Sequence, residues 1–390
     1  MLIDNLACST TTEGWRLSAT VNWEDCGFPS EELVFELSAP ISAAAIRHKE
    51  DTCPDAFLTA CFPLAALHGE ARVRIDASPC PMLIEGLRTA YGWWSVWGGV
   101  ATPAPRIEAN TSQPRRTAAG PHPATGFLSG GVDGLHMLMR NRQLYRPEDR
   151  AYIRDVVFVH GFDIGKRRRA PEDGRYRAAL DRLAPVAAET GARLVAARTN
   201  LRHLPSRPGF WEDRHSGAGL AAVGHAAALG AAFVFIGGSY SLYTPIPWGS
   251  HVVVDGLFSS QHVRIVHDGG RFTRLEKVRE IANWPTALDV LRCCPAPTGL
   301  EGNCGRCEKC LRTRLELLAV GIDETQALGA SLTPPELWDD IVPAEVGERL
   351  IFYDELLPEL RRAGYDGLCD LIEDKIVAHQ RRDQRRLALV

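Results

Sequence analysis

"FLSGGVDGLHML", residues 127–138, is the stretch that decides the fold: an apolar strand pattern ends, two glycines follow, and apolar residues then recur at helical spacing. Gly130 and Gly131 let the backbone approach an anion, and the N–H groups and dipole of the following helix favour negative charge. Ser129 can donate its hydroxyl to a phosphate oxygen, and Asp133 can cap the helix or hold Mg²⁺. The pattern predicts a phosphate-binding loop; a plain glycine turn capped by Asp133 is the alternative.

On the C-terminal side of this stretch, apolar strand patterns alternate with helical ones. Strands are predicted at 155–161, 192–200 and 232–239, and helices at 133–144, 176–191 and 217–231. This alternation is typical of right-handed βαβ units in an α/β fold with a doubly wound, mostly parallel sheet. Ligands of such sheets bind at the carboxyl ends of the strands. That edge is expected to bring together Ser129–Asp133, His160–Asp163, Thr199–Arg202 and Gly237–Tyr240.

The chain is expected to divide into four parts. Short, alternating β-rich runs predict a smaller β-rich N-terminal domain over residues 1–102. Residues 103–124 are rich in Pro, Ala, Ser and Thr and lack periodicity, so they are predicted to be a linker. Residues 125–320 carry the α/β pattern together with a cysteine cluster, and residues 321–390 form a helical C-terminal region.

Composition narrows the class of protein. The net charge of −4 argues against a chain built to coat nucleic acid. No apolar run reaches the roughly 20 residues of a membrane-spanning helix, so no membrane partner is expected. The start of the chain lacks the pattern of a signal peptide, which makes the reducing cytoplasm the expected compartment. The 11 cysteines are then better explained as buried thiols, reactive thiols or metal ligands than as disulfides.

The cysteines concentrate in "LRCCPAPTGLEGNCGRCEKCLRTR", residues 291–314. Two residues separate Cys304 from Cys307 and Cys307 from Cys310, so the three thiolates can converge on one ion. Cys294 is the candidate fourth ligand, with Cys293 as its competitor. Four thiolates in a tetrahedral set select Zn²⁺ and leave no open position, which makes the ion structural. An iron–sulfur cluster is the alternative.

The glycine loop resembles the pyrophosphate loop of the PP-loop ATPases (the N-type ATP pyrophosphatases), whose motif is Ser-Gly-Gly-x-Asp-Ser. Ser129, Gly130, Gly131 and Asp133 match this motif, and Gly134 stands where the motif has serine. Members of this family split ATP between the α and β phosphates and adenylate a carboxylate or amide oxygen. Loss of one hydrogen bond to a charged phosphate would cost about 1.5–3 kcal/mol, which weakens such a site without abolishing it.

The spacing of the cysteines makes this resemblance more specific, because it is shared with one family that carries a PP-loop. Cys-x9-Cys-Gly-x-Cys-x-x-Cys after a PP-loop sheet is similar to the zinc site of the 7-cyano-7-deazaguanine synthase family, which acts in queuosine biosynthesis. Those enzymes convert a carboxylate to an amide and then a nitrile with ATP and ammonia. The segment 273–283 is similar to their basic stretch near the substrate, which makes Arg274 and Lys277 candidates for contact with ATP or the carboxylate; the alternative for both is a solvated helix face. Together with Asp133 they are the expected catalytic residues. The resemblance covers roughly residues 125–320.

Further site residues follow from the resemblance and from the predicted sheet edge. The ATP site is expected to include Ser129, Gly130, Gly131, Val132, Asp133, Gly134, His160, Asp163 and Ser239. The long Gly-, Pro- and Ser-punctuated stretch 237–260 is predicted to line the substrate pocket, with Tyr240, His251 and Asp255 as substrate-binding residues. His251 can carry a proton, and a hydrogen-bonded structural histidine is the alternative.

The function expected from these features is ATP-dependent adenylation of a carboxylate and its transfer to ammonia or an amine, with ATP, Mg²⁺ and Zn²⁺ as cofactors. The expected partner is a small-molecule carboxylate or a modified macromolecule; a homodimer is left open, and no feature supports a nucleic-acid partner. There are two alternatives. One is an RNA-modifying enzyme of the thiolation type. The other is a non-catalytic ATP-binding subunit, which is supported by the lack of a hydroxyl at Gly134.

Overall fold

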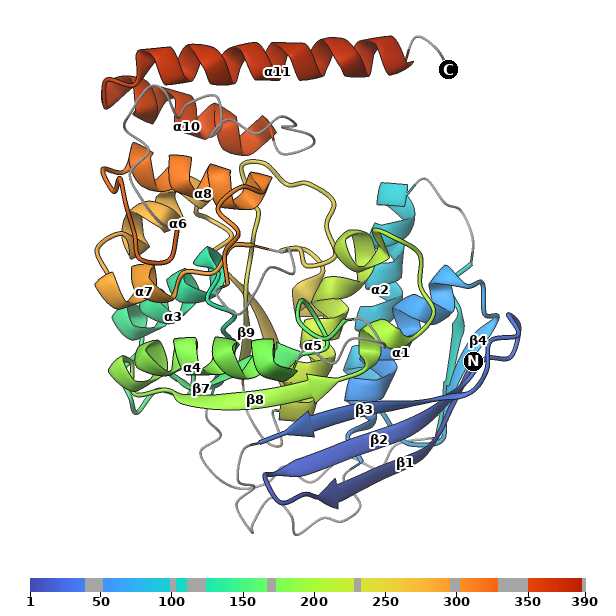
Figure 1. Cartoon of the computed structure of the whole chain (residues 1–390). Coiled ribbons are helices and arrows are strands. Elements are labelled where there is room, and N and C mark those ends of the chain that lie inside the picture. Colours follow the sequence, from blue (N-terminus) through green and yellow to red (C-terminus); the bar gives the residue numbers. More distant parts are fainter. Residues whose placement is uncertain are drawn as a thin grey trace. The chain divides into compact units, whose positions relative to one another are not determined.

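The computed structural model describes residues 1–38, 52–98, 103–110, 124–166, 173–227, 233–294, 302–328 and 350–387 (Figure 1). The strands are β1 (Leu2–Thr10), β2 (Trp15–Asn22), β3 (Glu31–Leu37), β4 (Arg72–Ile75), β5 (Arg106–Ala109), β6 (Ala124–Phe127), β7 (Ile153–His160), β8 (Arg193–Thr199), β9 (Phe233–Gly237) and β10 (Arg264–Asp268). The helices are α1 (Pro54–Leu67), α2 (Pro81–Gly98), α3 (Val132–Leu144), α4 (Asp173–Glu189), α5 (Ser216–Ala227), α6 (Arg274–Ile281), α7 (Pro285–Val290), α8 (Glu308–Ala319), α10 (Leu350–Arg362) and α11 (Asp366–Leu387). Most of the predicted linker, residues 111–123, lies outside the described part.

One mixed sheet holds the ten strands, in the order β10-β9-β6-β7-β8-β3-β2-β1-β4-β5. The strands from β10 to β8 run parallel to one another, while β3 is antiparallel to β8 and β2 is antiparallel to both β3 and β1. At the far side, β4 is parallel to β1 and to β5. The prediction of an α/β fold with a mostly parallel sheet is therefore confirmed at this level.

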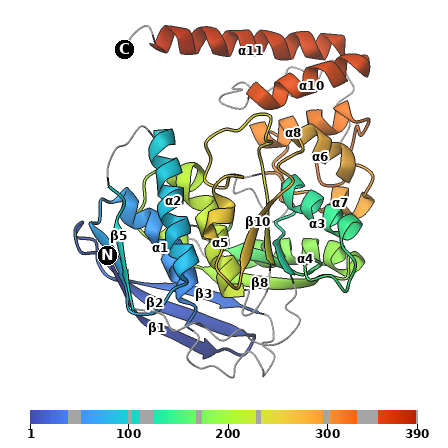
Figure 2. The same ribbon diagram turned by 180° about the vertical axis from the view of Figure 1, so that it is seen from behind.

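Burial patterns explain why these residues form strands of two kinds. All four residues of β6 are buried, as are Val156–Val159 of β7, which is typical of central parallel strands covered on both faces. In β2, buried residues alternate with half-buried ones, so only one face meets the core. Helix α1 packs against both α2 and α5 (Figure 2), and α4 packs on β7 and β8 (Figure 1).

The chain forms two compact units whose limits differ from the predicted domains. Unit 1 comprises residues 1–129, 137–240 and 245–270 and contains the whole sheet. Strand β3 pairs with β8 through Phe35 and Thr199, and a single hydrophobic core includes Phe35, Phe57, Val195 and Ile236, so the N-terminal strands share a compact unit with the parallel strands. Pairing between strands so far apart in the chain leaves no local signal in the sequence.

Unit 2 comprises residues 130–136, 241–244 and 271–390. It therefore includes the glycine loop after Ser129, helices α6 and α7, the clustered cysteines and the C-terminal helices. Its hydrophobic core joins Leu275 of α6, Leu315 and Leu318 of α8, and Tyr353 and Leu356 of α10. The helical C-terminal region is confirmed by α10 and α11, and residues 329–349 lie outside the described part.

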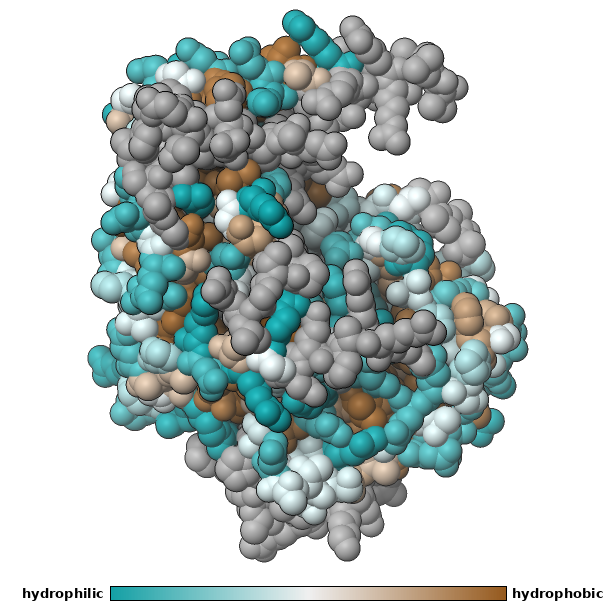
Figure 3. Space-filling model, viewed as in Figure 1, coloured by the Kyte–Doolittle hydropathy of each residue, from teal (hydrophilic) through white to brown (hydrophobic). Residues whose placement is uncertain are grey.

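Among the described residues, no helix combines the length and the apolar character needed to cross a membrane. On the face seen in Figure 3, hydrophilic side chains predominate and apolar ones are dispersed among them.

Candidate functional site

The glycine loop leads from β6 into α3 with the backbone that the sequence predicts. Gly130 has a φ of 79°, a left-handed conformation that glycine adopts without strain. The carbonyl of Gly130 accepts a hydrogen bond from the Arg292 N–H at 2.8 Å, and the carbonyl of Gly131 accepts one from Leu135 at 3.0 Å. The N–H groups of Val132, Asp133 and Gly134 lie in the first turn of α3. In the first turn of a helix, N–H groups have no acceptor within the helix and can bind an anion.

Asp133, in the first turn of α3, lies beside two cations of α6. The Lys277 Nζ atom is 3.3 Å from Asp133 Oδ1, and the Arg274 Nη1 atom is 4.0 Å from Asp133 Oδ2. The Lys277 side chain is fully buried and that of Arg274 is 10% exposed, so neither residue lies on a solvated helix face. The two cations are three residues apart and share one side of α6. Two fixed cations therefore lie next to the carboxylate of Asp133 at the start of α3.

A capping box fixes where α6 begins and therefore where these cations point. The Thr273 hydroxyl accepts a hydrogen bond from the Glu276 N–H at 3.3 Å, and the Glu276 carboxylate accepts one from the Thr273 N–H at 2.8 Å. Leu275 packs in the core of unit 2, and its N–H donates to Glu355 at 3.3 Å. Burial raises the pKa of Glu355. The segment 273–283, predicted from the resemblance, is therefore helical over residues 274–281 and well anchored.

The residues of unit 1 that are predicted to surround the nucleotide lie at the carboxyl ends of neighbouring strands. Because β9, β6 and β7 are parallel neighbours, their carboxyl ends place Ser239, Ser129 and His160 at the same edge. Asp163 lies exposed in the turn after β7. The His160 ring packs against Gly165, where an added Cβ would lie 2.2 Å from the imidazole, and edge-on to Tyr176. Their roles in nucleotide binding stay predictions.

Of the predicted substrate residues in unit 1, His251 and Asp255 are buried and Tyr240 is half-buried. Asp255 is fully buried, and its carboxylate accepts hydrogen bonds from Ser250 Oγ at 2.7 Å, the His251 N–H at 3.1 Å and His267 Nδ1 at 2.7 Å. His251 is 7% exposed and packs edge-on to Trp97. Burial, together with the neighbouring His267, lowers the pKa of His251.

This arrangement gives Asp255 a clear structural task, the ordering of the stretch from Ser250 to His267. Tyr240 packs edge-on against Trp248, with ring centroids 5.4 Å apart. Sequence reasoning missed His267, although the alternating strand pattern that ends in His267-Asp268 marks it as the last residue but one of a strand. The substrate roles of Tyr240, His251 and Asp255 stay predictions.

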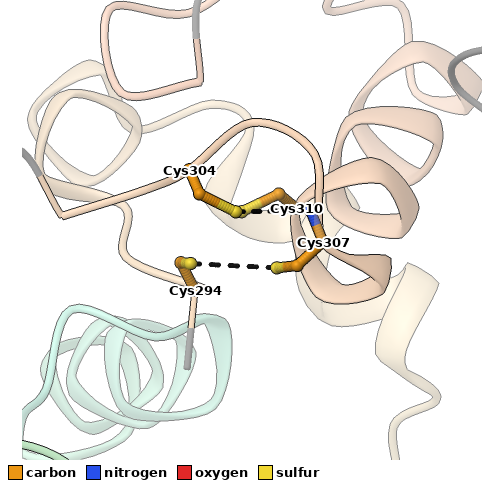
Figure 4. Close-up of side chains that lie close together, drawn as sticks. All are labelled: Cys294, Cys304, Cys307 and Cys310. Carbon is orange, nitrogen blue, oxygen red and sulfur yellow. Dashed lines mark hydrogen bonds between the residues drawn. The ribbon is translucent and has the colours of Figure 1, made fainter. Parts of the chain in front are cut away.

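Four cysteine thiols of unit 2 converge on one point (Figure 4). The sulfurs of Cys294, Cys304, Cys307 and Cys310 all lie within 4.8 Å of one another. Two pairs, Cys294–Cys307 and Cys304–Cys310, are separated by 3.8 and 3.9 Å. With Zn–S bonds of about 2.3 Å, the sulfurs of a tetrahedral site lie about 3.8 Å apart. The donor set and its geometry therefore fit a zinc ion.

The local backbone prepares these thiols for metal. Gly305 has a φ of 71°, which allows the tight turn between Cys304 and Cys307. The Cys307 N–H donates to the Cys304 sulfur at 3.3 Å. Burial raises the pKa of the Cys304 thiol, but hydrogen bonds from the N–H groups of Arg306 and Cys307 outweigh burial and bring this pKa down to about 7. The thiolate, which is the ligand form, is thereby favoured at Cys304. In contrast, burial raises the pKa of Cys307, and the hydrogen bond with Cys293 raises the pKa of Cys310.

The choice between Cys293 and Cys294 follows from this geometry. Cys294 belongs to the converging four, whereas the Cys293 sulfur approaches Cys310 alone among them, at 3.9 Å. Asn303, which sequence reasoning missed, aligns this segment: its Oδ1 accepts from the N–H groups of Cys293 and Cys294 at 2.9 and 3.1 Å. Its Nδ2 donates to the carbonyls of Leu291 and Ala327. The only local signal for Asn303 is its place next to a ligand cysteine.

No family model, no curated protein and no solved structure matches this chain. Its functional assignment therefore rests on the two clusters of unit 2, the thiols and the cations beside Asp133.

Proposed function

We propose that this protein adenylates a carboxylate with ATP and passes the activated acyl group to ammonia or an amine, releasing AMP and pyrophosphate. One observation carries the proposal: Lys277 and Arg274 converge on Asp133 at the start of α3, directly after a Ser-Gly-Gly turn. This cluster combines backbone N–H groups, two fixed cations and one carboxylate. Such a combination suits a polyphosphate bound with Mg²⁺.

In the proposed mechanism, the first turn of α3 binds the phosphates that leave as pyrophosphate. Lys277 and Arg274 stabilise the negative charge that develops on these phosphates as the substrate carboxylate attacks the α-phosphate. Asp133 orients both cations and offers an oxygen ligand for Mg²⁺. No protein nucleophile is needed, because alignment and charge stabilisation supply the catalysis.

Zinc in this proposal is structural. Cys294, Cys304, Cys307 and Cys310 would hold it, and four protein ligands leave no coordination position for substrate or water. The ion would tie the segment around residue 294 to the first turn of α8 and stabilise unit 2.

The test is incubation of the zinc-loaded protein with ATP, Mg²⁺, ammonia and 7-carboxy-7-deazaguanine, followed by mass spectrometry. We expect AMP, pyrophosphate and the amide or nitrile, and loss of these products in Asp133→Asn, an isosteric change that removes the charge facing Lys277. ATP turnover to ADP and phosphate would contradict the proposal.

A second candidate, a non-catalytic ATP-binding subunit, is favoured by one observation: Gly134 provides no hydroxyl in the first turn of α3. This candidate predicts ATP binding by the wild-type protein without AMP formation from any carboxylate offered. The same incubation, combined with calorimetric measurement of ATP binding, separates the two candidates.

A further inference from the structure

Helix α8 carries metal ligands at its start and polar residues further along. Cys307 directly precedes the helix and Cys310 lies in its first turn. Thr313 and Glu316 follow Cys310 at spacings of three residues, so the three residues lie on adjoining turns. All three are fully buried. A metal ion bound at Cys307 and Cys310 would therefore fix the helix that presents Thr313 and Glu316.

These two residues hold Arg274 from the side opposite Asp133. Arg274 Nε lies 2.8 and 3.0 Å from the two carboxylate oxygens of Glu316, and Arg274 Nη2 donates to the Thr313 hydroxyl at 3.2 Å. The remaining nitrogen, Nη1, is the one that lies 4.0 Å from Asp133. Because a guanidinium group is a rigid planar fork, fixing two of its nitrogens also fixes the direction of the third.

Glu316 is itself held in place. Arg312, one turn earlier on α8, donates from Nη1 to Glu316 at 2.9 Å and from Nε to Glu308 at 2.7 Å. The Arg312 guanidinium also stacks over the ring of Phe352, 4.2 Å from its centroid. The buried carboxylate of Glu316 thus has two cationic partners and little freedom to move.

We propose that α8 couples the metal site to the ATP site, with Glu316 as the positioning residue that aims Arg274 at the phosphates; this inference rests on the proposed function for the identity of the ligand. Without the ion, nothing holds the four sulfurs together, and the first turn of α8 loses its anchor. Arg274 then loses its fixed direction, and ATP binds more weakly. Metal loading and ATP binding are therefore linked, with a coupling of about tenfold.

The test measures ATP affinity of the full chain by calorimetry in excess Mg²⁺, once with the zinc-loaded protein and once after zinc has been removed and free zinc and chelator have been separated from the protein. In the wild-type protein, removal of zinc is expected to weaken ATP binding about tenfold. In Glu316→Gln, binding is expected to be weak in both forms and insensitive to zinc. A merely structural role of Glu316 would lower stability without abolishing this zinc dependence.

Glu308→Gln is the matched control, because it removes a carboxylate that pairs with Arg312 on the same helix but does not contact Arg274. This variant is expected to keep the wild-type zinc dependence. Thr313→Val serves if Glu316→Gln fails to fold: it removes one bond to Arg274, leaves the buried charges paired, and should reduce the zinc dependence in the same direction.

The outcomes separate the two proposals. ATP binding of equal strength in the loaded and zinc-free wild-type protein overturns the coupling and leaves the proposed function standing. The coupling is also overturned if removal of zinc weakens ATP binding by Glu316→Gln and by Thr313→Val as much as it weakens ATP binding by the wild-type protein. Absence of ATP binding by the loaded wild-type protein overturns both proposals.

Discussion

Gly134 is the residue at which the loop departs from the motif that it resembles. It lies in the first turn of α3 with helical backbone, so a serine fits its conformation. Gly134→Ser is expected to strengthen ATP binding about tenfold, because one hydrogen bond to a charged group contributes about 1.5–3 kcal/mol. Calorimetric titration with ATP and Mg²⁺ measures the change.

Gly134→Ala is the control for this substitution, since alanine raises helix propensity without adding a hydroxyl. Equal ATP affinities of the serine and alanine variants would show that position 134 does not face a phosphate.

Cys293 and Cys294 offer a second test at single residues. Cys294→Ser is expected to lower the zinc content of the purified protein well below one ion per chain, because Cys294 belongs to the four converging thiols. Cys293→Ser is expected to keep one zinc ion per chain. Elemental analysis of both variants, each confirmed as folded by circular dichroism, measures this difference. The opposite result would make Cys293 the ligand.

At the scale of elements, the capping box of α6 controls where Arg274 and Lys277 point. Thr273→Ala removes the hydroxyl that accepts the Glu276 N–H, and loss of such a cap costs about 0.5–2 kcal/mol. We expect a lower free energy of unfolding, measured with urea, together with weaker ATP binding. Thr273→Ser keeps the hydroxyl and should restore both quantities. Failure of the serine variant to do so would locate the effect outside the cap.

The elements also show what the sequence can and cannot predict. Strand β7 and the turn into α3 carry local signals, namely a continuous apolar run and paired glycines, and the sequence predicts both. The alternation of β2 belongs to the β-rich runs predicted over residues 1–102. The resemblance made Lys277 a candidate for contact with ATP or the carboxylate, but no local pattern predicts its place beside Asp133, 144 residues away. Glu316 and Asn303 were missed because a polar residue in a helix or loop does not reveal its partner.

At the scale of the whole molecule, residues 1–38 contribute three strands to the same ten-stranded sheet as the parallel strands β6 to β10. Removal of these residues would expose the edge of β8 and the core face that packs on Leu33 and Phe35. We expect the shortened chain, residues 39–390, to aggregate and to lose cooperative thermal unfolding. Size-exclusion chromatography and thermal melts followed by circular dichroism provide the measurement. A monomeric, cooperatively melting fragment would show that the N-terminal strands are dispensable.

The chemistry proposed for the whole protein is tested by exchange of isotopically labelled pyrophosphate into ATP, because reversible adenylation of a carboxylate is required for this exchange. We predict exchange that depends on Mg²⁺ and on the added carboxylate, 7-carboxy-7-deazaguanine being tested first, and that Lys277→Met abolishes. ATP binding without carboxylate-dependent exchange in the zinc-loaded wild-type protein would contradict the assignment of adenylation to the cluster of Asp133, Lys277 and Arg274.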